Sequence, residues 1–189
     1  LKSAPYLAGI AEKPDGKCHW LWTVDGVRIS VGHWPVAKGK GTVLIFPGRT
    51  EYVEKYGRTA MGLGKRGYAC AAIAWRGQGL ADRLLENYAV GHVDSFEDYQ
   101  LDVKAMLAHV KSLGLPEPYH MLGHSMGGCT GLRSLSEGLP VKSAAFSAPI
   151  AFLLTTSDPA DHLPCVILVV DPAVTRIHYI HDDQLRSSQ

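Results

Sequence analysis

The sequence predicts an α/β fold, with a mixed and mostly parallel central sheet and helices on both faces. Three observations support this expectation. Continuous apolar runs at 41–46 and 68–75 are typical of strands buried on both sides. Segments with a helical period alternate with such runs along the chain. An antiparallel hairpin precedes them, because two half-apolar segments flank Asp25-Gly26, a dipeptide that favours a two-residue hairpin turn.

Local patterns justify the elements in order. The hairpin strands are expected within Cys18–Trp34, as "HWLWTV" and "VRISVGHW". A helix is expected over Val53–Lys65, because Gly67 supplies a typical helix end. The segment Ser95–Asp98 resembles a capping box, with Asp in place of the usual Glu. After it, apolar residues keep a helical period as far as Val110.

The second half of the chain predicts a short strand, a helix and a further strand. "YHML" leads to Ser125, and a helix is expected from about Met126 to Ser136. "VKSAAFS" (Val141–Ser147) is the next strand. Residues 1–150 thus form the predicted core domain. Residues 151–189 form an atypical C-terminal segment, with a last strand at 164–170 and a polar tail.

Composition limits the class of function. The chain has 189 residues, of which 46% are hydrophobic and 20% are charged, as in an ordinary globular domain. The net charge of +1 gives no electrostatic footprint for nucleic acid. No apolar run approaches the roughly 20 residues of a membrane span, and no charged-then-apolar leader is present.

The four cysteines, Cys18, Cys70, Cys129 and Cys165, are scattered along the chain. None of them forms a pattern with zinc-ligand spacing. We therefore expect buried free thiols in a reducing cytoplasm, with no metal site and no cofactor.

The clearest chemical signal is G-x-S-x-G from Gly123 to Gly127, with Ser125 at its centre. A serine hydroxyl is a poor nucleophile until a base takes its proton. In this pattern the serine occupies a strained strand-to-helix turn, which the two glycines allow. The helix that follows points its N-terminus at the site, so the Met126 N–H is one expected oxyanion donor. The alternative is a glycine-rich helix start needed only for close packing.

A second oxyanion donor is expected from the loop after the strand at 41–46. The loop reads Phe46-Pro47-Gly48-Arg49-Thr50-Glu51-Tyr52, and Arg49 would offer its backbone N–H. The alternative is an ordinary strand-to-helix turn.

Four motifs occur in order: "FPGRTEYVEKY", "AWRGQGLADR", "GHVDSFEDYQLDV" and "GHSMGG". Together they resemble the lysophospholipase and monoacylglycerol lipase-like branch of the α/β-hydrolases, the serine aminopeptidase-like "hydrolase 4" group, over roughly Val31 to Ile150. The resemblance implies an α/β-hydrolase fold that cleaves carboxylic esters of glycerolipids without a cofactor. It implies Ser125 as the nucleophile, with the Arg49 and Met126 amides as the oxyanion hole.

In this family the serine is followed by an acid and then by a histidine. Asp171, at the end of "CVILVV", is the expected acid. Asp158 and Asp161 are weaker alternatives in a predicted loop.

The expected base is His181, with His178 and His162 as the other downstream histidines. Only ten residues lead from Asp171 to His181. A parallel crossover needs at least about a dozen, so an irregular path is expected. His124 is a poor candidate, because its side chain should point to the far side of the turn.

The segment that would form a cap domain in this family is missing, because about a dozen residues separate Ile150 from the last predicted strand. A truncated or frameshifted reading of a longer gene would explain why the resemblance stops there. Without further strands, Val141–Ser147 would be an exposed edge unless the strand at 164–170 covers it. We therefore expect a marginally stable protein that tends to associate.

Two main hypotheses stay open. The first is a serine hydrolase of carboxylic esters, acting on a small lipid or ester, with peripheral membrane contact and a homodimer left open. The second is a catalytically incomplete α/β-hydrolase remnant or binding protein that lacks a working acid and histidine pair. Thioester or peptide cleavage is a third possibility, because the fold and the nucleophile do not fix the acyl substrate.

Overall fold

The computed structural model describes residues 2–13, 15–149, 167–171 and 174–180. Within these ranges the strands are β1 (Lys2–Ala4), β2 (Lys17–Trp22), β3 (Arg28–Trp34), β4 (Gly41–Phe46), β5 (Tyr68–Ala74), β6 (Tyr119–His124), β7 (Ser143–Ser147), β8 (Ile167–Asp171) and β9 (Val174–Ile180). The α-helices are α1 (Gly57–Lys65), α2 (Tyr99–Ser112) and α3 (Met126–Ser136). Short 3-10 helices are η1 (Ala8–Ile10), η2 (Val53–Tyr56) and η3 (Phe96–Asp98).

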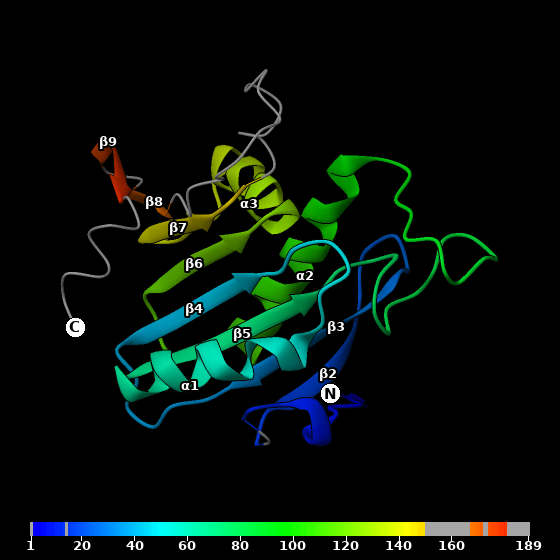
Figure 1. The fold of residues 1–189 in the computed structure, drawn as a ribbon, viewed down its shortest axis with the longest axis horizontal. Helices are drawn as coiled ribbons and strands as arrows, with labels where there is room; N and C mark the ends of the chain where they lie inside the picture. The colour runs from blue at the N-terminus through cyan, green and yellow to red at the C-terminus, as the bar shows by residue number, and fades with distance from the viewer. Residues whose placement is uncertain (1, 14, 150–166, 172–173, 181–189) are drawn as a thin grey trace, which may run out of the picture.

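These strands form one mixed sheet in the order β1-β2-β3-β5-β4-β6-β7-β8-β9 (Figure 1). Its centre, β5-β4-β6-β7, is parallel. On one side β3 joins β5 in antiparallel pairing, and on the other β8 and β9 extend β7 in the same manner. The predicted mixed sheet, with a parallel centre and an N-terminal antiparallel hairpin, is confirmed.

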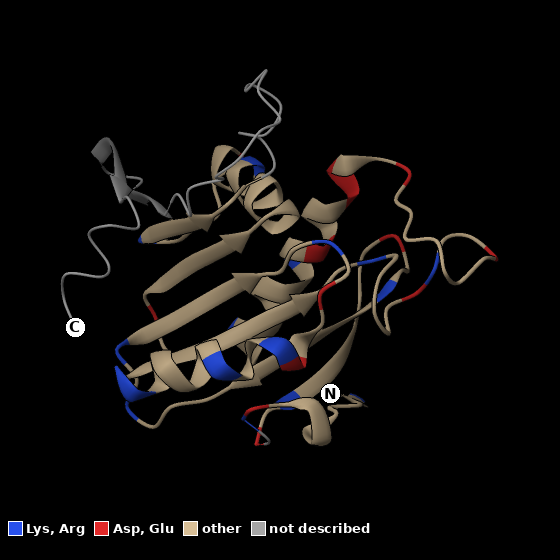
Figure 2. Ribbon diagram, viewed as in Figure 1, with Lys and Arg blue, Asp and Glu red and all other residues tan. Residues whose placement is uncertain are grey.

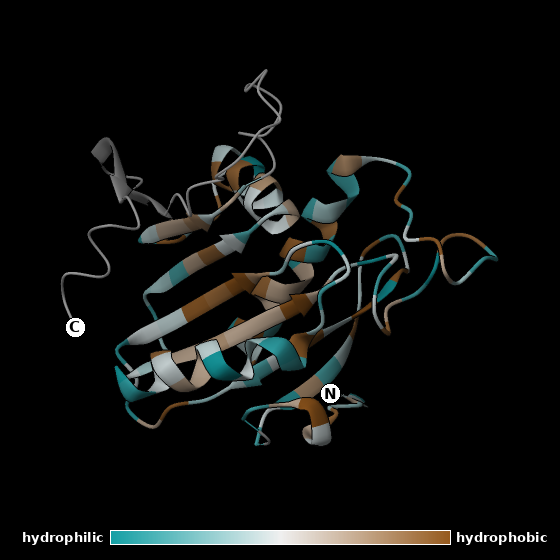
Figure 3. Cartoon of the chain, viewed as in Figure 1, coloured by the Kyte–Doolittle hydropathy of each residue, from teal (hydrophilic) through white to brown (hydrophobic). Residues whose placement is uncertain are grey.

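Helices cover both faces of the parallel centre, which explains its apolar composition. Every residue of β4 is buried, and Figure 3 shows hydrophobic stretches along β4 and β5. Figure 2 shows the same strands without charged residues, whereas α1 carries Lys and Arg. One core packs α2 and α3 against the sheet and includes Phe46, Ile73 and Met106. A second core packs η2 and α1 against the opposite face and includes Ile45 and Val53.

The strand order β5-β4-β6 creates a topological switch point. From β4 the chain passes through α1 on one face to β5, whereas from the neighbouring β6 it passes through α3 on the other face to β7. The connections therefore diverge at the carboxyl ends of β4 and β6, where open α/β sheets bind their ligands. The loop after Phe46 and the turn at Ser125 meet at this edge of the sheet.

Two local predictions are confirmed. The helix predicted over Val53–Lys65 is η2 followed directly by α1. The capping box forms, because Ser95 Oγ accepts from the Glu97 N–H at 3.2 Å and Asp98 Oδ2 accepts from the Ser95 N–H at 3.2 Å. It opens η3, which leads directly into α2.

The predicted two-residue hairpin turn is wrong. The last strand pair is Trp22 with Arg28, so Thr23–Val27 form a five-residue connection. The Thr23 N–H donates to the Val27 carbonyl at 3.0 Å, and Gly26 has φ +83°. Strand β1 was not predicted, and neither was β9, which lies partly in the predicted polar tail.

The direction of β8 places Asp171 away from Ser125. β8 runs antiparallel to β7, with Ile167 beside Ser147 and Val170 beside Ala144. The strand therefore ends at the edge of the sheet where β7 begins, opposite to the edge that carries Ser125. The expectation that β8 would deliver Asp171 to the serine assumed a parallel strand.

Among the described residues, no helix has both the length and the apolar character needed to cross a bilayer.

Candidate active site

Ser125 occupies a strained turn between β6 and α3. Its backbone has φ 51° and ψ −117°, a combination that costs an L-residue about 1–3 kcal/mol. Hydrogen bonds on both sides hold it there. The Ser125 N–H donates to the Ser147 carbonyl at 3.0 Å, and the Ser125 carbonyl accepts from the Gly128 N–H at 3.0 Å. Such strain is typical of functional sites, because it turns one side chain outward from a rigid frame.

The two glycines of G-x-S-x-G are required by close backbone contacts. A Cβ on Gly127 would lie 2.0 Å from the Phe46 carbonyl oxygen. A Cβ on Gly123 would lie 2.9 Å from the Gly128 Cα. α3 thus begins directly against the end of β4, and any side chain at either glycine would push the turn away from the switch point.

The loop after β4 approaches Ser125 closely. A Cβ on Gly48 would lie 3.2 Å from the Ser125 Cβ. Glu51 holds this loop, because its Oε2 accepts from the Gly48 N–H at 2.6 Å and from the Tyr56 hydroxyl at 2.6 Å. Its Oε1 forms an ion pair with Lys55.

The charge of Glu51 is stabilised by these partners. Burial alone would raise the pKa of Glu51, but the hydrogen bonds from Lys55, Tyr56 and the Gly48 N–H outweigh that effect and lower it. Glu51 is therefore an anion that fixes the loop. Its lone pairs are committed to donors within the loop and η2.

A second tie comes from Gln78, in the "RGQG" segment after β5. Gln78 Oε1 accepts from the Thr50 N–H at 2.5 Å, and its Nε2 lies 3.6 Å from the Met126 sulfur. Thr50 has φ 63°, so the loop bends sharply after Arg49. Gln78 thereby links the loop that carries Arg49 to the first residue of α3.

Next to this link the surface is hollowed into a cavity of about 220 Å³. Its walls include Arg49 and Met126, together with Gln78, Tyr99 and His92. The Arg49 guanidinium donates to the Gly91 carbonyl at 3.2 Å. The Arg49 side chain is therefore engaged with the opposite wall of the cavity.

His124, which precedes Ser125, has a neighbour at each ring nitrogen. Its Nδ1 lies 3.2 Å from the Ser147 carbonyl oxygen, and its Nε2 lies 3.9 Å from Glu51 Oε1. Both ring nitrogens thus have neighbours on β7 and on the loop after β4.

Buried ion pairs of Arg76 anchor the "RGQG" segment to neighbouring elements. Arg76 is 1% exposed, and its Nε donates to Asp102 Oδ1 at 2.8 Å while its Nη1 donates to Asp25 Oδ2 at 2.7 Å. The Arg76 N–H also donates to Asp102 Oδ2 at 3.0 Å. This group joins the end of β5 to α2 and to the β2–β3 connection.

The structure places three of the five predicted site residues at one edge of the sheet. Ser125, Met126 and Arg49 lie around the carboxyl ends of β4 and β6, whereas Asp171 ends β8 at the opposite edge. His181 lies outside the described residues, and so do the alternatives His162, Asp158 and Asp161. His178 is part of β9.

Sequence reasoning missed the supporting roles of Glu51, Tyr56 and Gln78. Each of them lies within a quoted motif, but their partners are set by the path of the loop. A glutamate five residues before a tyrosine carries no signal of its own.

Comparison with known proteins identifies the family. The family model "Serine aminopeptidase, S33" (Hydrolase_4) matches residues 37–181. Lysophospholipase L2 of Escherichia coli is 37% identical over 105 residues, which are 56% of this chain and 31% of that protein. The probable lysophospholipase L2 of Haemophilus influenzae is 29% identical over 93 residues, which are 49% of this chain and 29% of that protein. The chain thus spans less than a third of these relatives' length.

Solved structures agree on the fold. A soluble variant of monoglyceride lipase from Saccharomyces cerevisiae, in complex with a substrate analogue, has a TM-score of 0.58 at 26% identity. That match covers 79% of this chain and 48% of the lipase. An esterase of Pyrococcus furiosus has a TM-score of 0.61 at 22% identity, covering 79% of this chain and 57% of the esterase. The chain therefore belongs to the serine aminopeptidase S33 family of α/β hydrolases.

Proposed function

We propose that this chain carries the nucleophile and the oxyanion hole of a carboxylic ester hydrolase that acts on lysophospholipids or monoacylglycerols. The observation that carries the proposal is the strained backbone of Ser125 at the switch point, facing the loop that contains Arg49. The similarity to lysophospholipase L2 and to monoglyceride lipase supports a glycerolipid ester as the substrate.

In this proposal the Ser125 Oγ attacks the ester carbonyl while a base removes its proton. The carbonyl oxygen becomes an oxyanion, which accepts hydrogen bonds from the Met126 and Arg49 N–H groups. Collapse of the tetrahedral intermediate releases the alcohol, which takes the proton from the base. Water then attacks the acyl-serine by the same steps and releases the fatty acid, so Ser125 regains its proton.

For the base we propose His181, on an argument from strand direction. β9 runs in the same direction as β7, and Ile180 pairs with Ile167, which in turn pairs with Ser147. β9 therefore ends at the Ser125 edge of the sheet, and His181 is the next residue. β9 is three strands from β6, about 14 Å at the usual strand spacing, so the proposal requires the chain after Ile180 to return toward β6 by an irregular path.

The catalytically incomplete alternative is favoured by one observation. β8 ends at the edge opposite to Ser125, so Asp171 cannot support a base there. A serine with an oxyanion hole but without a working acid and histidine would retain only about 10³–10⁴-fold acceleration over water.

Two assays distinguish an active ester hydrolase from a catalytically incomplete one. They are labelling with a fluorophosphonate and turnover of p-nitrophenyl butyrate and lysophosphatidylcholine. We expect labelling and turnover by the native chain, both lost in Ser125→Ala and reduced in His181→Asn. Ser136→Ala, the same substitution on the exposed side of α3, is the matched control. Turnover that is equal in the native chain and in Ser125→Ala would rule out the enzyme proposal and leave the incomplete hydrolase.

The cytoplasmic location, peripheral membrane contact and homodimer remain predictions from the sequence. Fractionation of cells and size-exclusion chromatography of the purified chain test them directly.

A further inference from the structure

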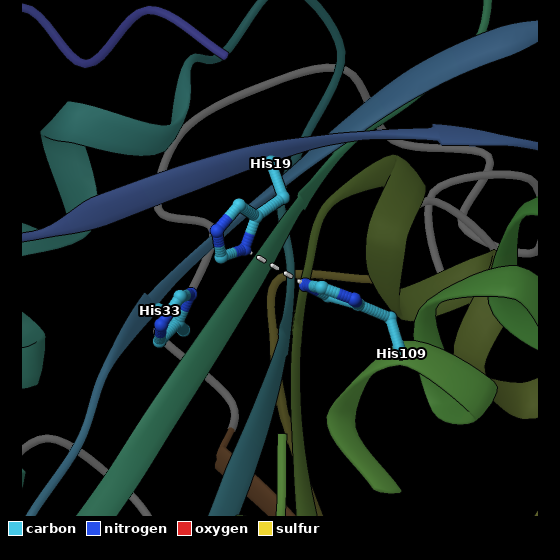
Figure 4. A group of neighbouring side chains, drawn as sticks. All are labelled: His19, His33 and His109. Atoms are coloured by element: carbon cyan, nitrogen blue, oxygen red, sulfur yellow. Dashed lines mark hydrogen bonds between the residues drawn. The ribbon is translucent and has the colours of Figure 1, made fainter. Parts of the chain in front are cut away.

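Three histidines from distant parts of the chain converge on the α2 face of the sheet. His19 lies on β2, His33 on β3 and His109 on α2 (Figure 4). One nitrogen from each ring can be chosen such that all three lie within 4.8 Å of one another. Figure 4 shows the three rings grouped together, with a dashed line from His19 to His109.

The fold explains how they meet. His19 pairs with Val31 and His33 pairs with Lys17 in the β2–β3 ladder, so His19 and His33 are diagonal neighbours on one face. His109 belongs to the buried stripe of α2, one turn after Met106, and that stripe packs on the same face. The rings of His19 and His33 stack with centroids 5.1 Å apart, and the His109 ring stands edge-on to them.

The separations suit a tetrahedral metal ion. Zinc binds imidazole nitrogen at about 2.0–2.1 Å, so two nitrogens on one tetrahedral ion lie about 3.3 Å apart. His19 Nδ1 and His109 Nε2 are already 3.2 Å apart. The third donor, on His33, lies within 4.8 Å of the other two, and its ring, which is stacked on His19, would have to turn for its lone pair to point at the same ion.

Protein partners alone leave this cluster poorly satisfied. His33 Nδ1 is buried and has no hydrogen-bond partner among the described residues, so a metal ion could take its lone pair. His109 Nδ1 is also buried without a partner there, but the nitrogen of His109 that faces His19 is Nε2. An unpaired buried polar nitrogen is unfavourable in a folded protein. Burial also lowers the pKa of both His33 and His109 to about 4, so both rings are neutral at pH 7 and offer a lone pair.

We propose that His19, His33 and His109 bind one divalent transition-metal ion of the zinc class. Imidazole is a preferred ligand of such ions, and three imidazoles with one water complete a tetrahedral site. His33 and His109 are buried while His19 is half-buried, so the water position faces solvent on the His19 side. The ion would fasten the β2–β3 hairpin to α2.

A nearby positive charge also makes a prediction about this site. The Lys17 ammonium helps to lower the pKa of His19 and of His33, after burial and other larger contributions. Lys17 is exposed at the start of β2. The positive charge of Lys17 repels a metal cation in the site, so removing that charge should strengthen metal binding.

Isothermal titration with Zn²⁺ on the full chain, with Co²⁺ absorption as a second readout, tests the proposal. We expect one ion per chain and tetrahedral Co²⁺ bands in the visible spectrum. His19→Gln and His109→Gln should each weaken binding by more than about 100-fold, because even an outer-shell change costs 10–100-fold. His19 is half-buried, so His19→Gln tests binding in a chain that still folds.

The control is His92→Gln, which alters an exposed histidine beside Asp94. It should leave Zn²⁺ affinity unchanged, whereas Lys17→Gln should raise it by a few-fold. Zn²⁺ should also raise the melting temperature of the native chain but not that of His19→Gln. Equal Zn²⁺ affinity in the native chain and in His19→Gln, or loss of binding in His92→Gln instead, would overturn the proposal.

Discussion

The Ser125 turn and the histidine cluster are built on the same sheet in opposite ways. Ser125, its proposed oxyanion donor Met126 and both glycines of the motif lie within five residues of sequence. His19 and His109 are 90 residues apart and meet only because α2 packs on the β2–β3 hairpin. A site contained in one turn can be recognised in the sequence, whereas a site shared by packed elements becomes visible only in the fold. A substitution at the Ser125 turn should therefore leave the histidine cluster unaffected, and the reverse should also hold.

The largest expected effect separates the two regions completely. Ser125→Ala should reduce ester turnover by about 10⁴-fold or more, because the serine is the proposed nucleophile. The same variant should keep the Zn²⁺ affinity of the native chain. Turnover assays and zinc titrations on Ser125→Ala and His19→Gln measure this. Coupled loss of both properties in either variant would show that the regions are not independent.

The second-largest expected effect is a loss of stability when the buried ion pairs of Arg76 are removed. Arg76 joins α2 to the β2–β3 connection through Asp102 and Asp25, and it also precedes Gln78. Arg76→Met leaves the fully buried Asp102 carboxylate without its partner, so it should lower the free energy of unfolding by about 3–5 kcal/mol. Urea denaturation measures the loss.

The control for that prediction is Arg58→Met. Arg58 is 79% exposed and pairs with Glu12 at the surface, so its loss should cost at most about 1 kcal/mol. Similar losses in the two variants would mean that the Arg76 pairs contribute no more than a surface pair.

A smaller effect should be confined to the Ser125 turn. Gly127→Ala places a methyl group against the Phe46 carbonyl and should lower the free energy of unfolding by about 1–3 kcal/mol. Ester turnover should fall with it, while zinc affinity should not change. Gly62→Ala, at a roomier glycine in α1, should be neutral or slightly stabilising. Unchanged turnover in Gly127→Ala would contradict the close packing of α3 against β4.

The smallest effect is a pH dependence on the hairpin side. The hydrogen bond from Arg76 lowers the pKa of Asp25 to about 2, below its ordinary 3.8. A lowered carboxyl pKa stabilises the fold above the unfolded value, and that contribution is lost as pH falls from about 4 through 2. Asp25→Asn keeps a turn-forming residue, so its stability deficit relative to the native chain should shrink over this range.

The deficit should be under about 1 kcal/mol, because the Asp25 side chain is 36% exposed and partly screened. Thermal unfolding between pH 5 and 2 measures it. Asp15→Asn, at a 70% exposed carboxylate beside Lys13, is the comparison, and a steeper pH effect there would contradict the role given to Arg76.

The features that the sequence could predict are those set by neighbouring residues, and the features that it could not predict are those set by packing. Helix ends, the capping box at Ser95 and the strained serine depend on neighbours a few residues away, and they were predicted correctly. The direction of β8 depends on which edge of β7 it joins, and no local pattern encodes that choice. For this reason Asp171, the expected acid, lies at the end of a strand that runs away from the Ser125 edge.

The same limit explains the hairpin and the metal proposal. Asp25-Gly26 has the local preference for a two-residue turn, but the Arg76 guanidinium draws the Asp25 carboxylate into a wider connection. The absence of a metal site was expected because no ligands are spaced as in a zinc motif. His19 and His33 are placed by strand register, and His109 by helix packing, so spacing along the chain could not show them.

Trp75 gives the chain a built-in optical probe of the loop after β4. Its indole N–H donates to the Pro47 carbonyl at 2.9 Å, and its ring is 2% exposed and stands edge-on to Phe46 and Tyr99. The loop that carries the proposed oxyanion donor Arg49 is thus attached to a fluorophore in apolar surroundings. Among the four tryptophans, Trp22 is 52% exposed and emits from water. Motion of the loop should therefore change the short-wavelength part of the tryptophan fluorescence. Substrate binding would then be observable without any label.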